Sequence, residues 1–318
     1  MIMRASSKKA SKGSRPSLAG KRRGRCEPFA FVSIAIAIGA LAFIVGAIAA
    51  IVIGGISHFG EALASEEIAF SLKMSVATST ISTAICLLLA LPTAYALSRT
   101  AMPCKRLAGV IMELTLSLPY ILLGFALLLI FSSPFGKALK EAGFAVVFQP
   151  AGIVFAQLIV NLPFAIRMVR TAFDSIDHRM EFVARTLGAS AWGAFRTVLL
   201  PLTRNPIIST AVLTWARGVG EFGATLMLVG VTRMKTETLP GSIYLSISTG
   251  NTDVAMATAM IMLIVSALTL VVANLLSKPV GASRVGGRRA RGRFALARFL
   301  KDAPVSTEVP YEKDSHGR

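Results

Sequence analysis

Apolar residues are gathered into six long blocks along the chain, and most polar residues lie between them. The blocks cover residues 29–56, 68–97, 107–131, 150–172, 206–231 and 254–276. A helix needs roughly 20 predominantly apolar residues to cross a bilayer, and each block reaches that length. The pattern therefore predicts an all-α membrane protein with six transmembrane helices.

Composition agrees with this prediction. Hydrophobic residues make up 54% of the 318 residues, charged residues only 16%, and the mean hydropathy is +0.66. Soluble domains carry about 25% charged residues. These values exclude an ordinary soluble enzyme, a disordered chain and a disulfide-rich secreted domain. The net charge of +18 does not indicate nucleic-acid binding, because the basic runs flank apolar spans, where they set topology and contact anionic lipids.

The distribution of Lys and Arg predicts the orientation in the membrane. If the N-terminus is cytoplasmic, 28 of the 34 Lys and Arg residues lie at the inner side and four lie in outer loops. This is the bias that cytoplasmic segments show. We therefore expect a basic cytoplasmic tail at 1–28, a six-helix membrane domain at 29–277 and a second basic cytoplasmic tail at 278–318, with the cell membrane as the location.

Two features of the spans concern packing and transport. Pro92, Pro119 and Pro163 lie inside predicted spans, where proline is tolerated and predicts a kink. Residues 78–83 form a run that is unusually rich in hydroxyl groups. Such a run either lines a polar path or bonds within its own helix and at a helix–helix contact. The sequence leaves both interpretations open.

The longest loop between spans, 173–205, has helical patterning. Asp177 is placed to cap a helix that starts near His178, Gly188 interrupts the run, and Pro201 is expected to end the second helix. The apolar positions of the two short helices follow helical spacing: Val183, Leu187, Trp192, Phe195 and Leu199. Periodicity alone fits a cytoplasmic docking surface and an amphipathic hairpin on the membrane equally well.

The spacing of this loop resembles the "EAA" loop of ABC-importer permeases. Ala184 is followed after three residues by Gly188, and Val198, Leu200 and Pro201 follow in the register of that motif. Phe182 stands where the motif has Glu, and Glu181 lies one residue early. The departure argues against a Glu-specific contact with an ATPase, and it gives Glu181 a smaller expected role than Gly188.

A narrower resemblance extends over about residues 66–277. Residues 217–227 (Arg-Gly-Val-Gly-Glu-Phe-Gly-Ala-Thr-Leu-Met) are similar to the fifth-span signature of molybdate permeases. Residues 236–244 resemble the external segment after that span, and residues 92–99 resemble the inner end of span two. Sulfate and tungstate permeases share much of this pattern.

The resemblance implies the fold of a type I ABC importer permease and a partner set. The chain would pair with a second copy, two cytoplasmic ATPase subunits would dock at 178–192, and an external binding protein would deliver an oxyanion, most simply molybdate or tungstate. The permease would hold no cofactor and perform no covalent chemistry, because ATP and Mg²⁺ would be bound by the ATPases. The coupling residues implied are Glu181, Phe182, Val183, Ala184, Leu187, Gly188 and Pro201.

Arg217 and Glu221 form an i, i+4 combination in an otherwise apolar span, where charges usually face a partner or a cavity. They are a structural pair, residues of the path, or charges exposed at the inner rim if the span starts later. Because Glu221 would cancel most of the charge of Arg217, the sequence does not favour a tight anion site here. The candidate path or gate residues are Arg217, Gly220, Glu221, Gly223 and Thr225.

Other functional classes are less well supported. The chain contains no G-x-x-x-x-G-K-[ST] string for binding ATP, and the G-x-G-x-x-G match at 218–223 lies inside a span without a β-strand pattern before it. No His, Cys, Asp and Glu constellation indicates a catalytic metal. A secondary transporter usually needs several intramembrane carboxylates, and here only Glu113 and Glu221 qualify. A membrane-anchored interaction protein would not need kinked spans.

Overall fold

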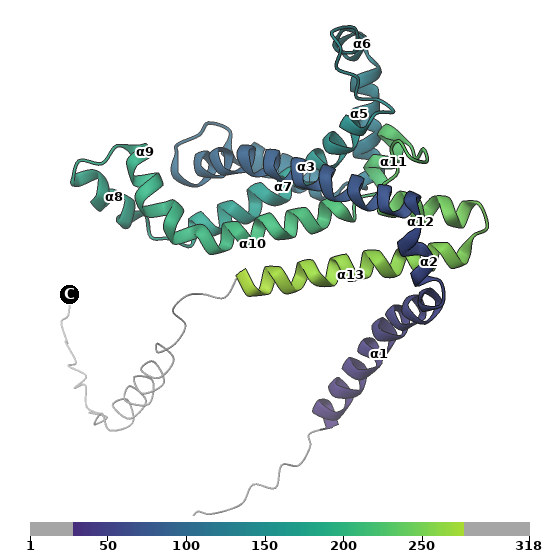
Figure 1. Ribbon diagram of the computed structural model, residues 1–318. Coiled ribbons are helices and arrows are strands. Elements are labelled where there is room, and N and C mark those ends of the chain that lie inside the picture. Colours follow the sequence, from purple (N-terminus) through teal and green to yellow (C-terminus); the bar gives the residue numbers. More distant parts are fainter. Residues whose placement is uncertain (1–27, 277–318) are drawn as a thin grey trace, which may run out of the picture.

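The computed structural model describes residues 28–276, and every regular element in that range is a helix (Figure 1). The first half contains α1 (Pro28–Ile56), α2 (Phe59–Ala64), α3 (Glu66–Arg99), α4 (Lys105–Ser117), α5 (Tyr120–Ser132) and α6 (Pro134–Glu141). The second half contains α7 (Pro150–Asp174), α8 (His178–Thr186), α9 (Ala191–Ala194), the π-helical turn η1 (Phe195–Leu199), α10 (Leu200–Val219), α11 (Gly223–Val229), α12 (Leu239–Ser248) and α13 (Thr252–Leu276). The all-α prediction is confirmed, and the basic tails lie outside the described residues.

The membrane spans match the apolar blocks in four cases. α1, α3, α7 and α13 are each long and apolar enough to cross a bilayer, and α4 with α5 makes a fifth span if the two are counted together. The block at 206–231 is divided between α10 and α11, so it is not one continuous helix. The arrangement is consistent with six spans if α4–α5 and α10–α11 are each counted as one broken span.

One of the three prolines breaks its span. α4 and α5 meet at Leu118 and Pro119 with a bend of 110°. Pro119 precedes the first residue of α5 and has a ψ angle of 132°, which lies outside the helical range. Pro92 and Pro163 lie inside the uninterrupted helices α3 and α7. α4–α5 is therefore a broken span, and we treat α10 and α11, which are separated at residues 220–222, as a second one.

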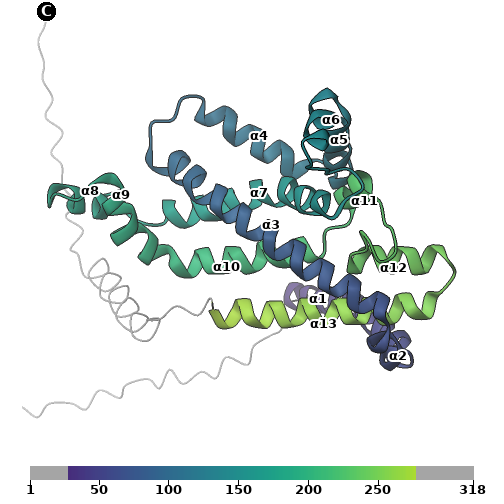
Figure 2. The same ribbon diagram turned by 45° about the horizontal axis from the view of Figure 1, so that its top comes forward.

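The centre of the molecule is formed by α3, α7 and α10, which run side by side (Figures 1 and 2). Polar side chains hold them together. The Gln157 side-chain nitrogen donates to the hydroxyls of Thr78 and Ser79, both at 3.3 Å, and to the carbonyl of Gly218 at 3.0 Å. Thr78 also donates to Met74 O within its own helix. These contacts favour packing over a polar path for this part of the 78–83 run.

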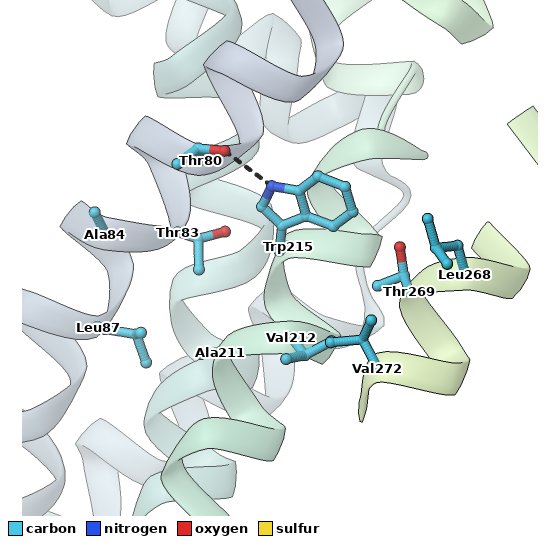
Figure 3. A pocket seen from close by; sticks show the side chains of 10 residues that line it. All are labelled: Thr80, Thr83, Ala84, Leu87, Ala211, Val212, Trp215, Leu268, Thr269 and Val272. Carbon is cyan, nitrogen blue, oxygen red and sulfur yellow. Dashed lines mark hydrogen bonds between the residues drawn. The ribbon is translucent and has the colours of Figure 1, made fainter. Parts of the chain in front are cut away.

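The outer side of the same run borders an apolar groove between α3, α10 and α13 (Figure 3). The indole N–H of Trp215 donates to the Thr80 hydroxyl at 3.0 Å across this groove. Its other lining residues are mainly apolar, for example Leu87, Val212 and Leu268. Because mainly apolar side chains surround Thr80 and Thr83 here, the groove lacks the polar or charged lining that an ion path needs.

α1 differs from the central helices because few other parts of the described chain pack against it. Its main contact is with α13, where Gly54 and Gly55 approach Met256 so closely that a Cβ on Gly55 would lie 2.7 Å from the Met256 carbonyl oxygen. None of the residues in its most apolar stretch is buried. Figure 1 shows α1 projecting away from the other helices. Its apolar sides are thus free to contact lipid or another chain.

Candidate coupling loop and helix-break junction

The helices α8 and α9 lie at one end of the central bundle, and α11 and α12 lie at the other (Figures 1 and 2). α8 begins where the sequence predicts, because the Asp177 side chain accepts from the backbone N–H of Arg179 at 2.9 Å. The Ser190 hydroxyl caps α9 in the same way by accepting from Gly193 N at 3.0 Å. Both caps satisfy backbone donors that a helix start leaves free. The two short helices are therefore specified locally.

Gly188 makes the turn between α8 and α9. Its φ angle is +94°, and a Cβ built on it would meet no atom within 4 Å. The turn requires glycine because of the left-handed backbone and not because another surface approaches.

Apolar side chains of this loop face solvent. Leu187 is 83% exposed, and Phe182, Val183 and Trp192 are each more than half exposed. Val183, Ala184 and Leu187 also line a groove between α8 and η1, together with Val198. We call the exposed set Phe182, Val183, Leu187 and Trp192 the coupling face. Apolar patches of this kind mark contacts with proteins or membranes.

Glu181 lies on the opposite side of α8 and is buried. Its carboxylate is 2.7 Å from Nε of Arg99, whose side chain is only 3% exposed. Nη2 of Arg99 donates to the carbonyls of Phe173 at 2.7 Å and Ile176 at 2.9 Å. Arg99 therefore joins the end of α3 to the end of α7 and to α8. The sequence places Glu181 in the coupling loop but gives no sign of its partner, which lies 82 positions away.

Pro201 does not end the second helix of the loop, contrary to the sequence prediction. The chain stays helical from α9 through η1 into α10, and Pro201 is the second residue of α10. Proline lacks the N–H that a normal helical hydrogen bond would use, and the wider backbone of the π-helical turn before it accommodates the missing bond. Phe195, at the start of η1, packs against the rings of Tyr95, Phe173 and Trp192. The loop is thus continuous with α10.

The helical pairing of Arg217 with Glu221 is also not present. α10 ends at Val219, so Glu221 does not lie one turn above Arg217 on a continuous helix. Nε of Arg217 donates to Asn161 Oδ1 at 3.2 Å, and its Nη2 donates to the Tyr120 hydroxyl at 2.7 Å. The guanidinium carbon is 4.6 Å from the centre of the Phe164 ring. Arg217 is therefore held by neutral groups of α5 and α7.

Glu221 instead closes the start of α11. Its carboxylate accepts from the backbone N–H of Ala224 at 2.7 Å and of Thr225 at 3.1 Å, and also from the Thr225 hydroxyl. Gly223 begins α11 directly beside Tyr120 and Ile121, with ordinary van der Waals space for a Cβ. Gly220 is exposed in the break. The path candidates thus gather where the two broken spans meet, and we call this region the helix-break junction.

A further polar cluster lies in the segment between α11 and α12, outside the predicted spans. Thr236, Glu237 and Thr238 are almost completely buried. Burial raises the pKa of Glu237, and a hydrogen bond from Met234 N at 3.3 Å opposes that rise. Arg233 pairs with Glu67 at 2.9 Å instead. Within residues 28–276 no three His, Cys, Asp or Glu side chains gather as metal ligands would.

The fold resembles that of chains in solved ABC transporters. A bacterial alginate ABC transporter, solved with its pentasaccharide-bound periplasmic protein, matches with a TM-score of 0.63 and 19% identity, over 79% of this chain and 93% of that one. The MetNI methionine ABC transporter matches with a TM-score of 0.54 over 67% of this chain and 98% of that chain. At this identity the likeness concerns the fold.

Sequence relatives are more similar. The molybdenum transport system permease protein ModB of Mycobacterium tuberculosis is 37% identical over 202 residues, which is 63% of this chain and 76% of the relative. ModB of Escherichia coli is 35% identical over 184 residues, 54% of this chain and 80% of the relative. The molybdate/tungstate permease protein WtpB of Thermococcus kodakarensis is 35% identical over 158 residues, 50% of this chain and 60% of the relative.

A family model matches residues 90–280. This range includes the coupling loop, the four helices α4, α5, α10 and α11 that meet at the helix-break junction, and the chain onward through α13. That model is described as the binding-protein-dependent transport system inner membrane component. The match covers more than half of the chain. This chain therefore belongs to the family of inner membrane components of binding-protein-dependent transport systems.

Proposed function

We propose that this protein is the permease subunit of an ATP-driven importer for molybdate or tungstate. The relatives above are named for molybdenum, molybdate or tungstate, and this favours these oxyanions over sulfate. The permease provides a path through the membrane and does no covalent chemistry. Two copies of the chain form the path, with both termini in the cytoplasm.

The coupling face carries the proposal for energy transfer. It presents four exposed apolar side chains on two short capped helices between α7 and α10, at one end of the bundle. A cytoplasmic ATPase that receives this face would bury apolar area, which is the main driving force for association. ATP and Mg²⁺ belong to that subunit. Closing of two ATPases would move two coupling faces, and the continuous α9–η1–α10 helix would carry the motion to the helix-break junction.

The remaining partners follow from the same arrangement. An external binding protein would deliver the oxyanion at the side of α12 and the 231–238 segment. The bare sides of α1 suit lipid and a second copy of the chain. This partner set also explains why the chain needs no site of its own for ATP.

The test is reconstitution of the permease with its ATPase and binding protein in liposomes. We expect ATP-dependent uptake of molybdate and tungstate, measured by mass spectrometry, and no uptake with an inactive ATPase. Sulfate uptake without molybdate uptake would replace the assigned substrate.

A matched pair of variants tests the coupling face. Leu187→Asp places a charge on the coupling face, and Leu63→Asp makes the same change at an exposed position of α2. We expect Leu187→Asp to abolish co-purification of the ATPase, because docking would bury an unpaired carboxylate there. Leu63→Asp should leave co-purification unchanged. Equal retention of the ATPase by both variants would exclude this face as the docking site.

A further inference from the structure

Arg217 is a cation without an anionic partner. Its two hydrogen bonds go to the Asn161 amide oxygen and the Tyr120 hydroxyl, and the rings of Phe164 and Tyr120 lie beside it. No carboxylate of the described part of the chain forms an ion pair with it. A charge inside a membrane span usually has a counter-ion or marks a path for a charged species. Arg217 has no counter-ion among the described residues, so the second explanation, a path for a charged species, is left.

The nearest carboxylate in sequence is already used. Both oxygens of Glu221 accept backbone N–H groups of α11, at 2.7 Å and 3.1 Å, and one also accepts the Thr225 hydroxyl. Glu221 is 4% exposed. It therefore neutralises the start of α11, and the expectation that it cancels the charge of Arg217 does not hold.

The guanidinium keeps donors for a ligand. It has five N–H groups, of which Nε–H and one Nη2–H are engaged by Asn161 and Tyr120. Three donors remain on a group that is fixed in direction by two hydrogen bonds and a ring face. Such a planar fork suits the oxygens of an oxyanion better than a lysine ammonium would. The residue is also only partly buried, so an ion can reach it.

The position of Arg217 is the second argument. It lies two residues before the end of α10 and contacts the first residue of α5, so it touches both broken spans. α5 and α11 approach so closely that a Cβ on Gly124 would collide with the Ala224 backbone. In transporters, helices that break within the membrane line the site that the substrate passes. A cation at such a junction faces the route of the ion.

We propose that Arg217 is the contact in the permease that recognises a tetrahedral oxyanion during its passage, with Asn161 and Tyr120 as the residues that orient the guanidinium. The inference rests on the proposed function and adds the residue that selects charge. In a homodimer each copy contributes one guanidinium, and two would balance a dianion. Binding through one such group per subunit is weak enough for the ion to leave again, as conduction requires.

Arg217→Gln, Arg217→Lys and Arg204→Gln test this in the reconstituted importer. Arg204→Gln is the matched control, because Arg204 is an exposed arginine of the same helix. We expect Arg217→Gln to assemble with the ATPase but to lose at least about tenfold in molybdate uptake, the effect of one charge-assisted contact. Arg217→Lys should keep part of the uptake, and Arg204→Gln all of it.

A second readout measures binding directly. Millimolar molybdate should raise the melting temperature of the detergent-purified permease and of Arg204→Gln, and chloride at equal ionic strength should not. Arg217→Gln should lose this rise. If wild-type importer takes up no molybdate, tungstate or sulfate, the proposed function itself fails. If wild-type uptake is normal and Arg217→Gln matches it, only the role of Arg217 is overturned.

A purely structural role gives a different pattern. Under that role Arg217→Gln and Arg217→Lys lose uptake alike, in proportion to the stability lost with the bonds to Asn161 and Tyr120, and molybdate still raises the melting temperature of both. If Arg217→Gln does not assemble, Arg217→Lys decides the question. Assembly with residual uptake supports anion recognition, and failure of the lysine variant to assemble overturns it.

Discussion

Two regions of the molecule use an arginine and a glutamate in opposite ways. At the coupling loop, Arg99 and Glu181 lie 82 positions apart and form a buried ion pair at 2.7 Å. At the helix-break junction, Arg217 and Glu221 lie four positions apart and bind different groups. The first pair fixes a helix to the bundle. The second combination leaves a cation free for a ligand.

The reason for the difference is the continuity of the backbone. Residues at i and i+4 face each other only on an unbroken helix. α10 ends at Val219, and Glu221 then finds the free N–H groups at the start of α11, which are nearer and attract a negative charge. At the coupling loop Asp177 already caps the start of α8, so no helix start competes with Arg99 for the Glu181 carboxylate. The end of α7 leads into α8 and brings Glu181 close to Arg99. Breaks and helix ends thus decide which charges meet.

The largest effect is expected from breaking the buried pair. Glu181→Ala leaves the Arg99 guanidinium buried without its carboxylate, and loss of one partner of a buried pair costs about 3–5 kcal/mol. α8 should then detach from the end of α3, so that the ATPase no longer couples to transport. Thermal unfolding and uptake in liposomes measure the two consequences.

The double exchange Arg99→Glu with Glu181→Arg is the control. It should recover part of the stability, since the ion pair is retained with reversed polarity. A mild effect of Glu181→Ala, as the offset from the sequence motif suggests, would mean that the pair does not hold α8.

The next effect concerns the junction. Glu221→Ala leaves two backbone N–H groups of α11 without an acceptor, at about 1–3 kcal/mol for each unsatisfied buried donor. The exchange Arg217→Glu with Glu221→Arg should give no recovery, because the two side chains do not pair and a guanidinium in place of the Glu221 carboxylate cannot accept those N–H groups. Melting temperatures of the single and double variants decide this. If this exchange recovered as much melting temperature as the exchange of Arg99 and Glu181 does, Arg217 and Glu221 would have to form a direct ion pair.

The sequence was sufficient for the features that depend on local order. Apolar blocks located the long helices, Asp177 marked the start of α8, and Gly188 marked the interruption between α8 and α9, because each follows from a residue and its neighbours. The motif spacing also placed a joint between two short helices at Gly188. The break at Gly220 was not foreseen, although three glycines within 218–223 were a signal for it.

Other features depend on tertiary contacts and could not be predicted. Nothing near Glu181 indicates Arg99, and nothing near Arg217 indicates Tyr120 and Asn161. Pro201 looked like a helix end because a proline interrupts a regular α-helix, whereas the preceding π-helical turn accommodates it. Partners across helices are fixed by packing, and a single sequence does not contain that information.

A smaller effect on stability is expected at Gly188, together with a specific effect on coupling. Valine at φ +94° is disfavoured by about 1–2 kcal/mol. Gly143 has a φ of +92° and equally open space, so Gly143→Val carries the same strain outside the coupling loop. We expect both variants to insert into membranes with similar melting temperatures, but only Gly188→Val to lose ATP-dependent uptake. Loss of uptake in both variants would assign the effect to strain alone.

The smallest effect concerns Glu237, a buried glutamate that has neither an arginine, as Glu181 has, nor two backbone donors, as Glu221 has. Arg233 is committed to Glu67, and burial raises the pKa of Glu237. A raised pKa in the folded state means that the folded protein holds this proton more tightly than the unfolded chain does. The stabilisation is therefore complete below the usual glutamate pKa of about 4.3 and is lost as the pH rises through the raised value.

Glu237→Gln removes this titration, so the melting temperature of the wild type relative to Glu237→Gln should fall with rising pH, by less than about 4 °C. Glu141→Gln, at an exposed site of α6, should show no such trend. A constant difference between wild type and Glu237→Gln from about pH 4.5 to 8 would mean that the hydrogen bonds from Met234 and Ser242 cancel the effect of burial on the pKa, and a rising difference would mean that they outweigh it.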